Sequence, residues 1–249
     1  MGKDLTQYSI FSSIARWHVN QFVEQAACTV SAGSRVLDAG AGECDYKRYF
    51  THCGYVAVDL AVGQQSWDFG RLDAIARLSE LPLRSDVFEA ILCTQTLEHL
   101  EFPRESIAEL HRVLKPGGKL FVTVPMAQGE HQPPHDFFRY TSYGLRSLLV
   151  HAGFIDVDIR PMGGKYTRLA YDLPTLFPLF RRPAACTARE LALTPVRLLS
   201  HAAVRLAQFV CMHLDRFDTQ RLHPLGWCAT ASKLSGSAYA GSCPPPGRS

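Results

Sequence analysis

The sequence lacks a strong excess of charge, paired cysteines and any long apolar run. Its 249 residues carry a formal net charge of only +3, whereas a nucleic-acid partner usually requires a concentrated basic face. None of its eight cysteines forms a CxxC pair, so buried free thiols in a reducing cytoplasm are predicted. The first residues lack the apolar segment of a signal peptide, and no apolar run approaches the roughly 20 residues of a spanning helix. We therefore expect a cytoplasmic protein that binds no nucleic acid.

Short apolar segments alternate with amphipathic ones. RVLDA, YVAVD, EAILC and KLFVTVP are apolar on both faces, as parallel strands covered on both sides are. The apolar spacing predicts helices at residues 103–118 and 142–153, and a half-exposed strand at 154–160. Strands that alternate with helices predict an α/β fold with a doubly wound, mostly parallel sheet.

Differences in composition and in the spacing of apolar residues divide the chain into four parts. Residues 1–34 are predicted to be an N-terminal helical segment, and residues 35–162 a Rossmann-like cofactor-binding core. Residues 163–234 are predicted to form a helical insertion or lid, interrupted by prolines, followed by the final strand. Residues 235–249, rich in Gly, Ser and Pro, are predicted to be a disordered tail.

A glycine turn follows the first predicted strand. In the stretch VLDAGAG, Gly40 and Gly42 allow a sharp turn and a close approach of the backbone to a ligand. Asp38 lies at the carboxyl end of the strand, where open α/β sheets bind ligands, and a carboxylate there can pair with a cationic amine. A GxG pair alone is also compatible with an ordinary turn between a strand and a helix.

A second acidic residue suggests what the ligand contains. Asp59 ends the next predicted strand, where a carboxylate can accept both hydroxyls of a ribose. The glycine run does not continue as GxGxxG. Instead Glu43 and Asp45 follow, and acidic side chains are poor neighbours for a pyrophosphate. The pattern therefore predicts a ligand with a ribose and no pyrophosphate.

At this point the sequence resembles a known family. The segments LDAGAG, VAVD, FEAILCTQTLEHL and ELHRVLKPGGKLFVTVP are similar, in order and spacing, to the motifs of class I S-adenosylmethionine-dependent methyltransferases. The resemblance covers roughly residues 35–160 and implies a seven-stranded sheet with a helical insertion before the last strand. It also implies S-adenosyl-L-methionine as cofactor, held by Asp38, Gly40 and Gly42 around the methionine part, Asp59 at the ribose, Leu60 at the adenine and Gln95 near the methyl-transfer face.

The sequence departs from the family at one position. The family commonly has an acid four residues before its Leu-Pro to bind the adenine amino group, and this chain has Arg77 there. An arginine cannot accept that hydrogen bond. Three explanations stay open: a backbone group holds the adenine, Asp73 or another acid substitutes, or the cofactor binds weakly.

The segment GEHQPPHDFFRYTSYGL contains the candidate general base. His135, or His131, lies just beyond the strand KLFVTVP and could remove a proton from the acceptor, because an imidazole is poised near neutral pH. The alternative is that His135, Asp136, Arg139 and Tyr140 stiffen the loop and cap the following helix. Glu98-His99 is likewise interpreted as ordering its loop.

No metal site is predicted. His131 and His135 flank Pro133-Pro134, so no helix can align them as in HExxH proteins, and no neighbouring acid or cysteine cluster completes a ligand set.

These observations favour an enzyme that moves a methyl group to an O, N or C atom of a small-molecule or glycan-like acceptor, with the insertion shaping the acceptor pocket. A non-catalytic cofactor-binding or partner protein of the same fold is the alternative, favoured by Arg77. A third possibility is a peripheral membrane enzyme acting on a lipid, suggested by Arg181, Arg182, Arg197 and Arg205 among apolar residues. Arginines spaced along a helix more often mark a solvated face. The sequence leaves the oligomeric state open.

Overall fold

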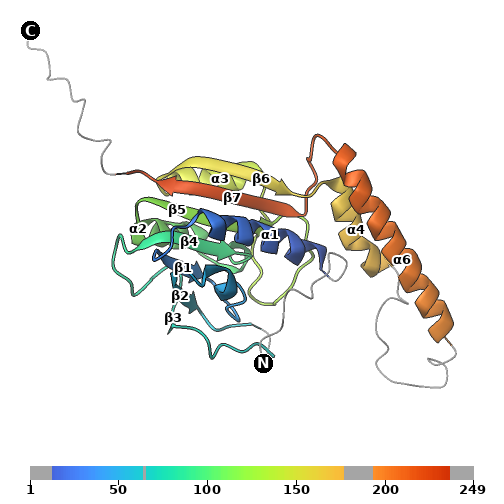
Figure 1. Cartoon of the computed structure of the whole chain (residues 1–249), viewed down its shortest axis with the longest axis horizontal. Coiled ribbons are helices and arrows are strands. Elements are labelled where there is room, and N and C mark those ends of the chain that lie inside the picture. The colour runs from blue at the N-terminus through green and yellow to red at the C-terminus, as the bar shows by residue number, and fades with distance from the viewer. Residues whose placement is uncertain (1–12, 64–65, 177–192, 236–249) are drawn as a thin grey trace, which may run out of the picture.

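The computed structural model describes residues 13–63, 66–176 and 193–235. Its centre is a seven-stranded sheet in the order β3-β2-β1-β4-β5-β7-β6 (Figure 1). Pairing is parallel from β3 to β5, and β7 runs antiparallel to both of its neighbours. The predicted seven-stranded, mostly parallel sheet is confirmed. Its strands are β1 (Arg35–Ala39), β2 (Gly54–Asp59), β3 (Ala74–Ile75), β4 (Phe88–Thr94), β5 (Leu114–Pro125), β6 (Phe154–Met162) and β7 (Gly226–Lys233).

Helices cover both faces of the sheet. The α-helices among the described residues are α1 (Ile14–Thr29), α2 (Pro103–Val113), α3 (Ser142–His151), α4 (Lys165–Leu176) and α6 (Thr194–Leu214). The short 3-10 helices are η2 (Lys47–Phe50), η3 (Leu97–His99) and η5 (Asp215–Phe217). One buried cluster joins α2 and α3 to the sheet, and a second joins α1, α4 and α6 to its other face. This double cover explains why the central strands are apolar on both sides.

The predicted elements agree with the structure except in two details. The two-residue strand β3 was not predicted, because it is too short to show a periodic pattern. Helix α2 ends at Val113 rather than at the Pro116-Gly117-Gly118 stop, since the chain already enters β5 at Leu114. No helix among the described residues is long and apolar enough to cross a membrane.

The helices α4 and α6 form a hairpin that projects from the sheet (Figure 1). They precede β7, where a helical insertion was predicted. Two buried carboxylates fasten the base of the hairpin. Asp215 accepts the backbone N–H groups of Gly164 and Thr167, and Asp218 accepts that of Lys165. The predictions for the segment between the two helices, residues 177–192, and for the tail from residue 236 lie outside the described residues.

Candidate functional site

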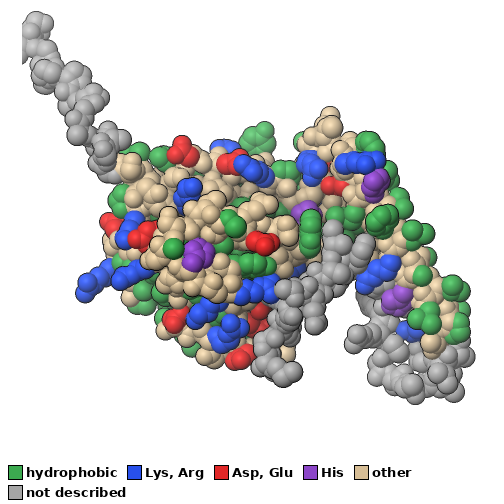
Figure 2. Space-filling model, in the orientation of Figure 1, with side chains coloured by type: hydrophobic (Ala, Val, Ile, Leu, Met, Phe, Trp, Pro, Cys, Tyr) green, Lys and Arg blue, Asp and Glu red, His purple; other side chains and the backbone are tan. Residues whose placement is uncertain are grey.

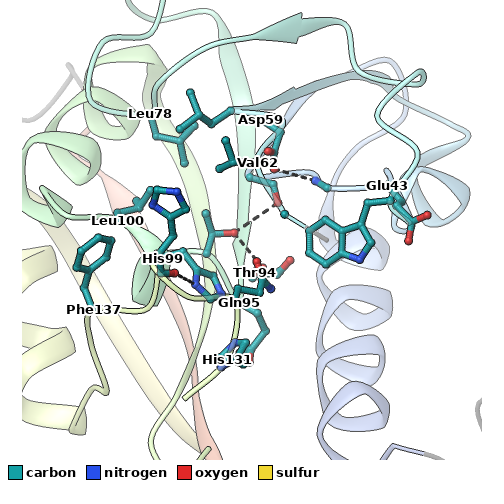
Figure 3. Close-up of a pocket in the computed structure, with 18 of the residues that line it drawn as sticks. Glu43, Asp59, Val62, Leu78, Thr94, Gln95, His99, Leu100, His131 and Phe137 are labelled. Carbon is teal, nitrogen blue, oxygen red and sulfur yellow. Dashed lines mark hydrogen bonds between the residues drawn. The ribbon is translucent and has the colours of Figure 1, made fainter. Parts of the chain in front are cut away.

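A cavity of about 1460 Å³ lies at the carboxyl ends of β1, β2 and β4. Typical ligand pockets occupy about 300–1,000 Å³, so this cavity has room for a cofactor and a second molecule. Figure 3 shows Glu43 and Asp59 on one side of it, and His99, Leu100 and Phe137 on the other. Tyr171 of α4 also lines the cavity, as expected if the insertion contributes to the acceptor pocket.

The glycine turn packs tightly between β2 and the loop after β4. The backbone N–H groups of Gly40 and Ala41 both donate to the Val58 carbonyl. Gly40 has φ +83°, and a Cβ at that position would lie 2.2 Å from Cγ2 of Thr96. Only glycine fits there. Gly40 and Gly42 both line the cavity, where the sequence placed them.

Two backbone N–H groups hold the carboxylate of Asp59 in place at the end of β2. Oδ2 accepts the N–H of Gly42 at 2.9 Å, and Oδ1 accepts the N–H of Ala61 at 2.8 Å. A carboxylate offers about four lone-pair sites, so each oxygen keeps capacity for a ribose hydroxyl. The side chain that was predicted to hold the ribose therefore also orients the glycine turn.

Asp38 does not line the cavity. It is fully buried beneath the turn, where Oδ2 accepts the hydroxyl of Tyr55. Oδ1 is buried without a hydrogen-bond partner among the described residues. Burial raises the pKa of Asp38 to about 7. Direct contact between Asp38 and the cofactor stays a prediction, and in the structure Asp38 supports the turn from below.

The side of the cavity that is predicted to hold the adenine carries apolar residues and the exposed Arg77. Leu60 and Val62 line it and keep 38% and 43% of their surface exposed, enough to pack on a flat ring. Arg77 lies in the lining, whereas Asp73 uses Oδ2 to accept the N–H of Ala57 on β2. Asp73 holds the sheet edge and is not among the residues that line the cavity, so a backbone group, another acid and weak binding stay open as explanations for the missing acid.

The opposite side carries Gln95 and three histidines. Gln95, His99 and His131 line the cavity (Figure 3), and His135 lines it too. Gln95 has φ +50°, a conformation that non-glycine residues rarely adopt, and its side chain donates to Thr123. Such backbone positions cluster at functional sites, which is a signal that sequence patterns do not contain.

His99 connects two loops of this side. Its Nδ1 lies within hydrogen-bond distance of the His135 carbonyl, which can only accept, so Nδ1 carries the proton. Burial lowers the pKa of His99, and the neutral ring therefore keeps its lone pair on Nε2. Its ring lies 4.8 Å from that of His131, edge to face. The interpretation that His99 orders its loop agrees with this contact, but the sequence did not reveal that His135 is the residue it holds.

Side-chain hydrogen bonds brace the loop after β5, as the structural alternative for this segment predicted. Arg139 binds both carboxylate oxygens of Asp136, and Asp136 accepts the N–H of His131. The hydroxyl of Tyr140 donates to the Leu97 carbonyl. The helix cap was assigned to the wrong residues, because the side chain of Thr141 accepts the N–H of Gly144 at the start of α3.

Glu98 is a buried carboxyl group directly beneath the histidines. Its side chain is fully buried, and neither carboxylate oxygen has a hydrogen-bond partner among the described residues. Burial raises the pKa of Glu98 to about 8, although the nearby Arg139 opposes the shift. Near neutral pH the folded protein therefore holds Glu98 mainly as the neutral acid.

The described residues contain one grouping with the ligand types of a metal site. Potential ligand atoms of Glu98, His99 and His131 all lie within 4.8 Å of one another. The sequence argument weighed only His131 with His135, and missed this set because Glu98 and His99 are distant in the chain. Nη2 of Arg139 lies 3.4 Å from Nδ1 of His131, and this fixed positive charge disfavours a dication there.

We expect Glu98→Gln to make the free energy of unfolding less dependent on pH. Unfolded Glu98 ionises near its ordinary pKa of about 4.3, whereas the folded group keeps its proton up to about pH 8. Between these values the native state binds more protons, so the contribution of Glu98 to stability falls as pH rises. The variant should match the wild type at pH ~5 and become relatively more stable at pH ~9.

Denaturant unfolding at both pH values measures this difference. Glu105→Gln is the matched control, because Glu105 is an exposed carboxylate on α2, and it should leave the pH dependence unchanged. An equal stability difference between Glu98→Gln and the wild type at both pH values would mean that Glu98 is ionised in the folded protein.

Comparison with known proteins agrees with the interpretation of this site as a methyltransferase site. Residues 37–122 match the family model described as a methyltransferase domain. The chain is 34% identical over 128 residues to a demethylmenaquinone methyltransferase of Renibacterium salmoninarum, an alignment covering 47% of this chain and 50% of that protein. It is 32% identical over 128 residues to an Arabidopsis thaliana tRNA (carboxymethyluridine(34)-5-O)-methyltransferase, covering 48% and 31%. The chain thus spans about half the length of these relatives, or less.

Solved structures share the fold. Phosphoethanolamine N-methyltransferase 2 of Haemonchus contortus, in complex with S-adenosyl-L-methionine, has a TM-score of 0.57 at 15% identity, covering 88% of this chain and 53% of that one. The [4+2]-cyclase SpnF has a TM-score of 0.55 at 22% identity, covering 88% and 81%. Identities this low show the shared fold alone.

Residues 37–122 thus carry a methyltransferase domain, and the sheet order and the relatives support the resemblance to class I S-adenosylmethionine-dependent methyltransferases. The cofactor that this family match supports is S-adenosyl-L-methionine. The cavity fits it: Gly40 and Gly42 line the cavity without side chains, and Asp59 keeps acceptor sites at the end of β2. Glu43 and Asp45 line the cavity together with Arg16, whose Nη1 pairs with Oδ2 of Asp45 at 2.9 Å. Which residues contact the cofactor stays a prediction.

Proposed function

We propose that this protein transfers a methyl group from S-adenosyl-L-methionine to an O, N or C atom of a small-molecule or glycan-like acceptor. The observation that carries the proposal is the two-sided cavity. One side offers Asp59, Gly40 and Gly42 to a nucleoside with a cationic group, and the other offers histidines to a second molecule. Its volume of about 1460 Å³ exceeds the usual size of a single-ligand pocket.

The bound cofactor supplies an electrophilic methyl group on a sulfonium. The task of the chain is then to align the acceptor and exclude water, which can provide much of the rate enhancement of a direct displacement. Residues of α1, the loop after β4 and Tyr171 of α4 enclose the cavity and support this role. An acceptor that carries a proton also needs a base, for which we propose His135, with His131 as the second candidate.

The proposed acceptor is a small molecule in the cytoplasm rather than a nucleic acid. The formal net charge of only +3 supports this, because a nucleic-acid partner usually requires a concentrated basic face. The printed name of one relative refers to demethylmenaquinone, and that of another refers to a tRNA, so relatives alone do not decide the acceptor. The six described cysteines are all free, which supports a reducing compartment.

The second candidate is a protein that binds the cofactor without methylating. Arg77, in the place of an adenine-binding acid, favours it. A fold does not by itself impose an activity. Calorimetric titration with S-adenosylhomocysteine tests cofactor binding, and a preference for NAD would contradict the proposal. Mass spectrometry of metabolite extracts, incubated with and without the protein, then tests transfer through the appearance of methylated products.

We expect methyl transfer to survive exhaustive chelation. The positive charge of Arg139 beside His131 and the proton held by Glu98 near neutral pH both oppose a resident dication. Activity should be measured before and after treatment with a chelator, followed by removal of the chelator. Loss of activity that one divalent ion restores, together with loss of bound metal in Glu98→Gln, would instead assign a metal to Glu98, His99 and His131.

A further inference from the structure

Helix α6 exposes apolar side chains along its outer side. Leu198, Leu199, Leu206, Phe209 and Val210, here called the apolar stripe, are between 45% and 71% exposed. They recur at helical spacing and therefore share one face. Figure 2 shows hydrophobic side chains along this helix, at the right of the view.

The opposite face of α6 is already packed. Val204, Gln208 and Cys211 are buried against α4 and the sheet, and Gln208 donates to the Ala170 carbonyl. A helix that is apolar on both its buried and its outer face needs a second apolar environment. Exposed contiguous apolar surface of this kind marks a site that binds a protein or a membrane.

The charge of the hairpin favours a membrane over a second copy of the chain as the partner of the apolar stripe. The described residues of this part, 165–176 and 193–222, contain six Lys or Arg against three Asp or Glu, so the hairpin is positively charged. Two of the three acids, Asp215 and Asp218, are only 6% exposed, and helix α6 itself contains no acid. A second copy docked through the same face would bring two positive surfaces together, which is unfavourable.

We propose that the hairpin of α4 and α6 docks the protein on the surface of an anionic lipid bilayer, with the apolar stripe inserted among the lipids. The helix lies in the interface rather than spanning it, in agreement with the described helices being too short or too polar to cross. Arg216, whose guanidinium stacks on the exposed ring of Phe217, continues the cationic and apolar pattern beyond the end of α6.

Co-sedimentation of the full chain with vesicles tests the proposal. We expect binding to vesicles of phosphatidylcholine with phosphatidylserine to be about tenfold stronger than to phosphatidylcholine alone, and to weaken as salt is added. The double variant Leu206→Ser, Phe209→Ser should lose about tenfold or more of the binding, because it removes two inserted side chains. Val150→Ser, which changes an exposed apolar residue on α3, is the matched control and should bind as the wild type does.

Three results would overturn the proposal. Equal binding to both kinds of vesicle would contradict the role of charge. Failure of the wild type to sediment with either vesicle would contradict docking altogether. A dimer in light scattering that the double variant converts to a monomer would show that the stripe joins two copies. The melting temperature of each variant shows whether the substitution causes misfolding. The affinity of each variant for S-adenosylhomocysteine shows whether the cofactor site is intact, so a failure of membrane docking can be distinguished from a failure of the proposed methyl transfer.

Discussion

Replacement of Asp59 by alanine should weaken the binding of S-adenosylhomocysteine about 10- to 150-fold, equivalent to roughly 1.5–3 kcal/mol. The carboxylate holds the N–H groups of Gly42 and Ala61 through one site on each oxygen. Its remaining lone pairs can accept the two ribose hydroxyls, and charged acceptors form stronger hydrogen bonds than neutral ones. Alanine removes all of these bonds. Calorimetric titration of wild type and variant measures the difference.

The experiment must separate ribose binding, which is predicted for Asp59, from support of the glycine turn, which the hydrogen bonds to Gly42 and Ala61 provide. Thermal melting without ligand reports the second role. Asp158→Ala, at an exposed carboxylate on β6, is the control for a general effect of lost charge and should leave the affinity unchanged. A lower melting temperature in Asp59→Ala with undiminished affinity would mean that Asp59 serves the turn alone.

The sequence allowed much of the fold to be predicted, because its strongest signals are local. The apolar segments around Leu37, Val58 and Ile91 are buried on both faces of the sheet, and such burial leaves a continuous apolar run. The Gly40 turn was predictable for a similar reason: its positive φ and the contact with Thr96 leave no alternative to glycine. The two-residue strand β3 carries no such signal.

The interior of the site was less accessible to prediction, because it depends on contacts between distant segments. Glu98 and His99 lie 32 or more residues before His131, and only the folded chain brings them together. The burial of Asp38 beneath the turn, against Tyr55, is likewise a property of packing. A periodic pattern indicates that a residue is near the sheet edge, but it does not tell whether the side chain faces the cavity or the core.

The apolar stripe on α6 illustrates a further limit. A periodicity of three and four residues predicts an amphipathic helix, and a soluble helix normally turns its apolar face inward. In α6 the inward face is taken by Val204 and Cys211, while Leu206 and Phe209 face outward. A helix with two apolar faces looks like a buried helix in sequence, and only its position at the projecting hairpin distinguishes the two (Figure 1).

Replacement of His135 by alanine should lower kcat by about 10²–10⁴ while the affinity for S-adenosylhomocysteine barely changes. His135 is exposed within the cavity lining, and its backbone carbonyl is tied to Nδ1 of His99. This tie fixes the backbone from which the imidazole extends, as a positioned base requires. If His135 accepts the proton of the acceptor, the lower inflection in the dependence of kcat/KM on pH should also disappear. Once a methylated product is identified, steady-state rates between pH ~5 and ~9 give both quantities.

A structural role for His135 predicts a different result, and the two can be separated. Because Asp136 and Arg139 brace the loop independently of the imidazole, loss of the ring alone should lower the melting temperature by little. If His135 is only a brace, the melting temperature should fall and most of the turnover should remain. His151→Ala, at an exposed histidine on α3, is the matched control and should change neither. If the variant keeps both its melting temperature and more than about a third of its rate, His135 is neither the base nor a brace of the loop; His131 is then the next candidate, and after it a transfer that requires no base.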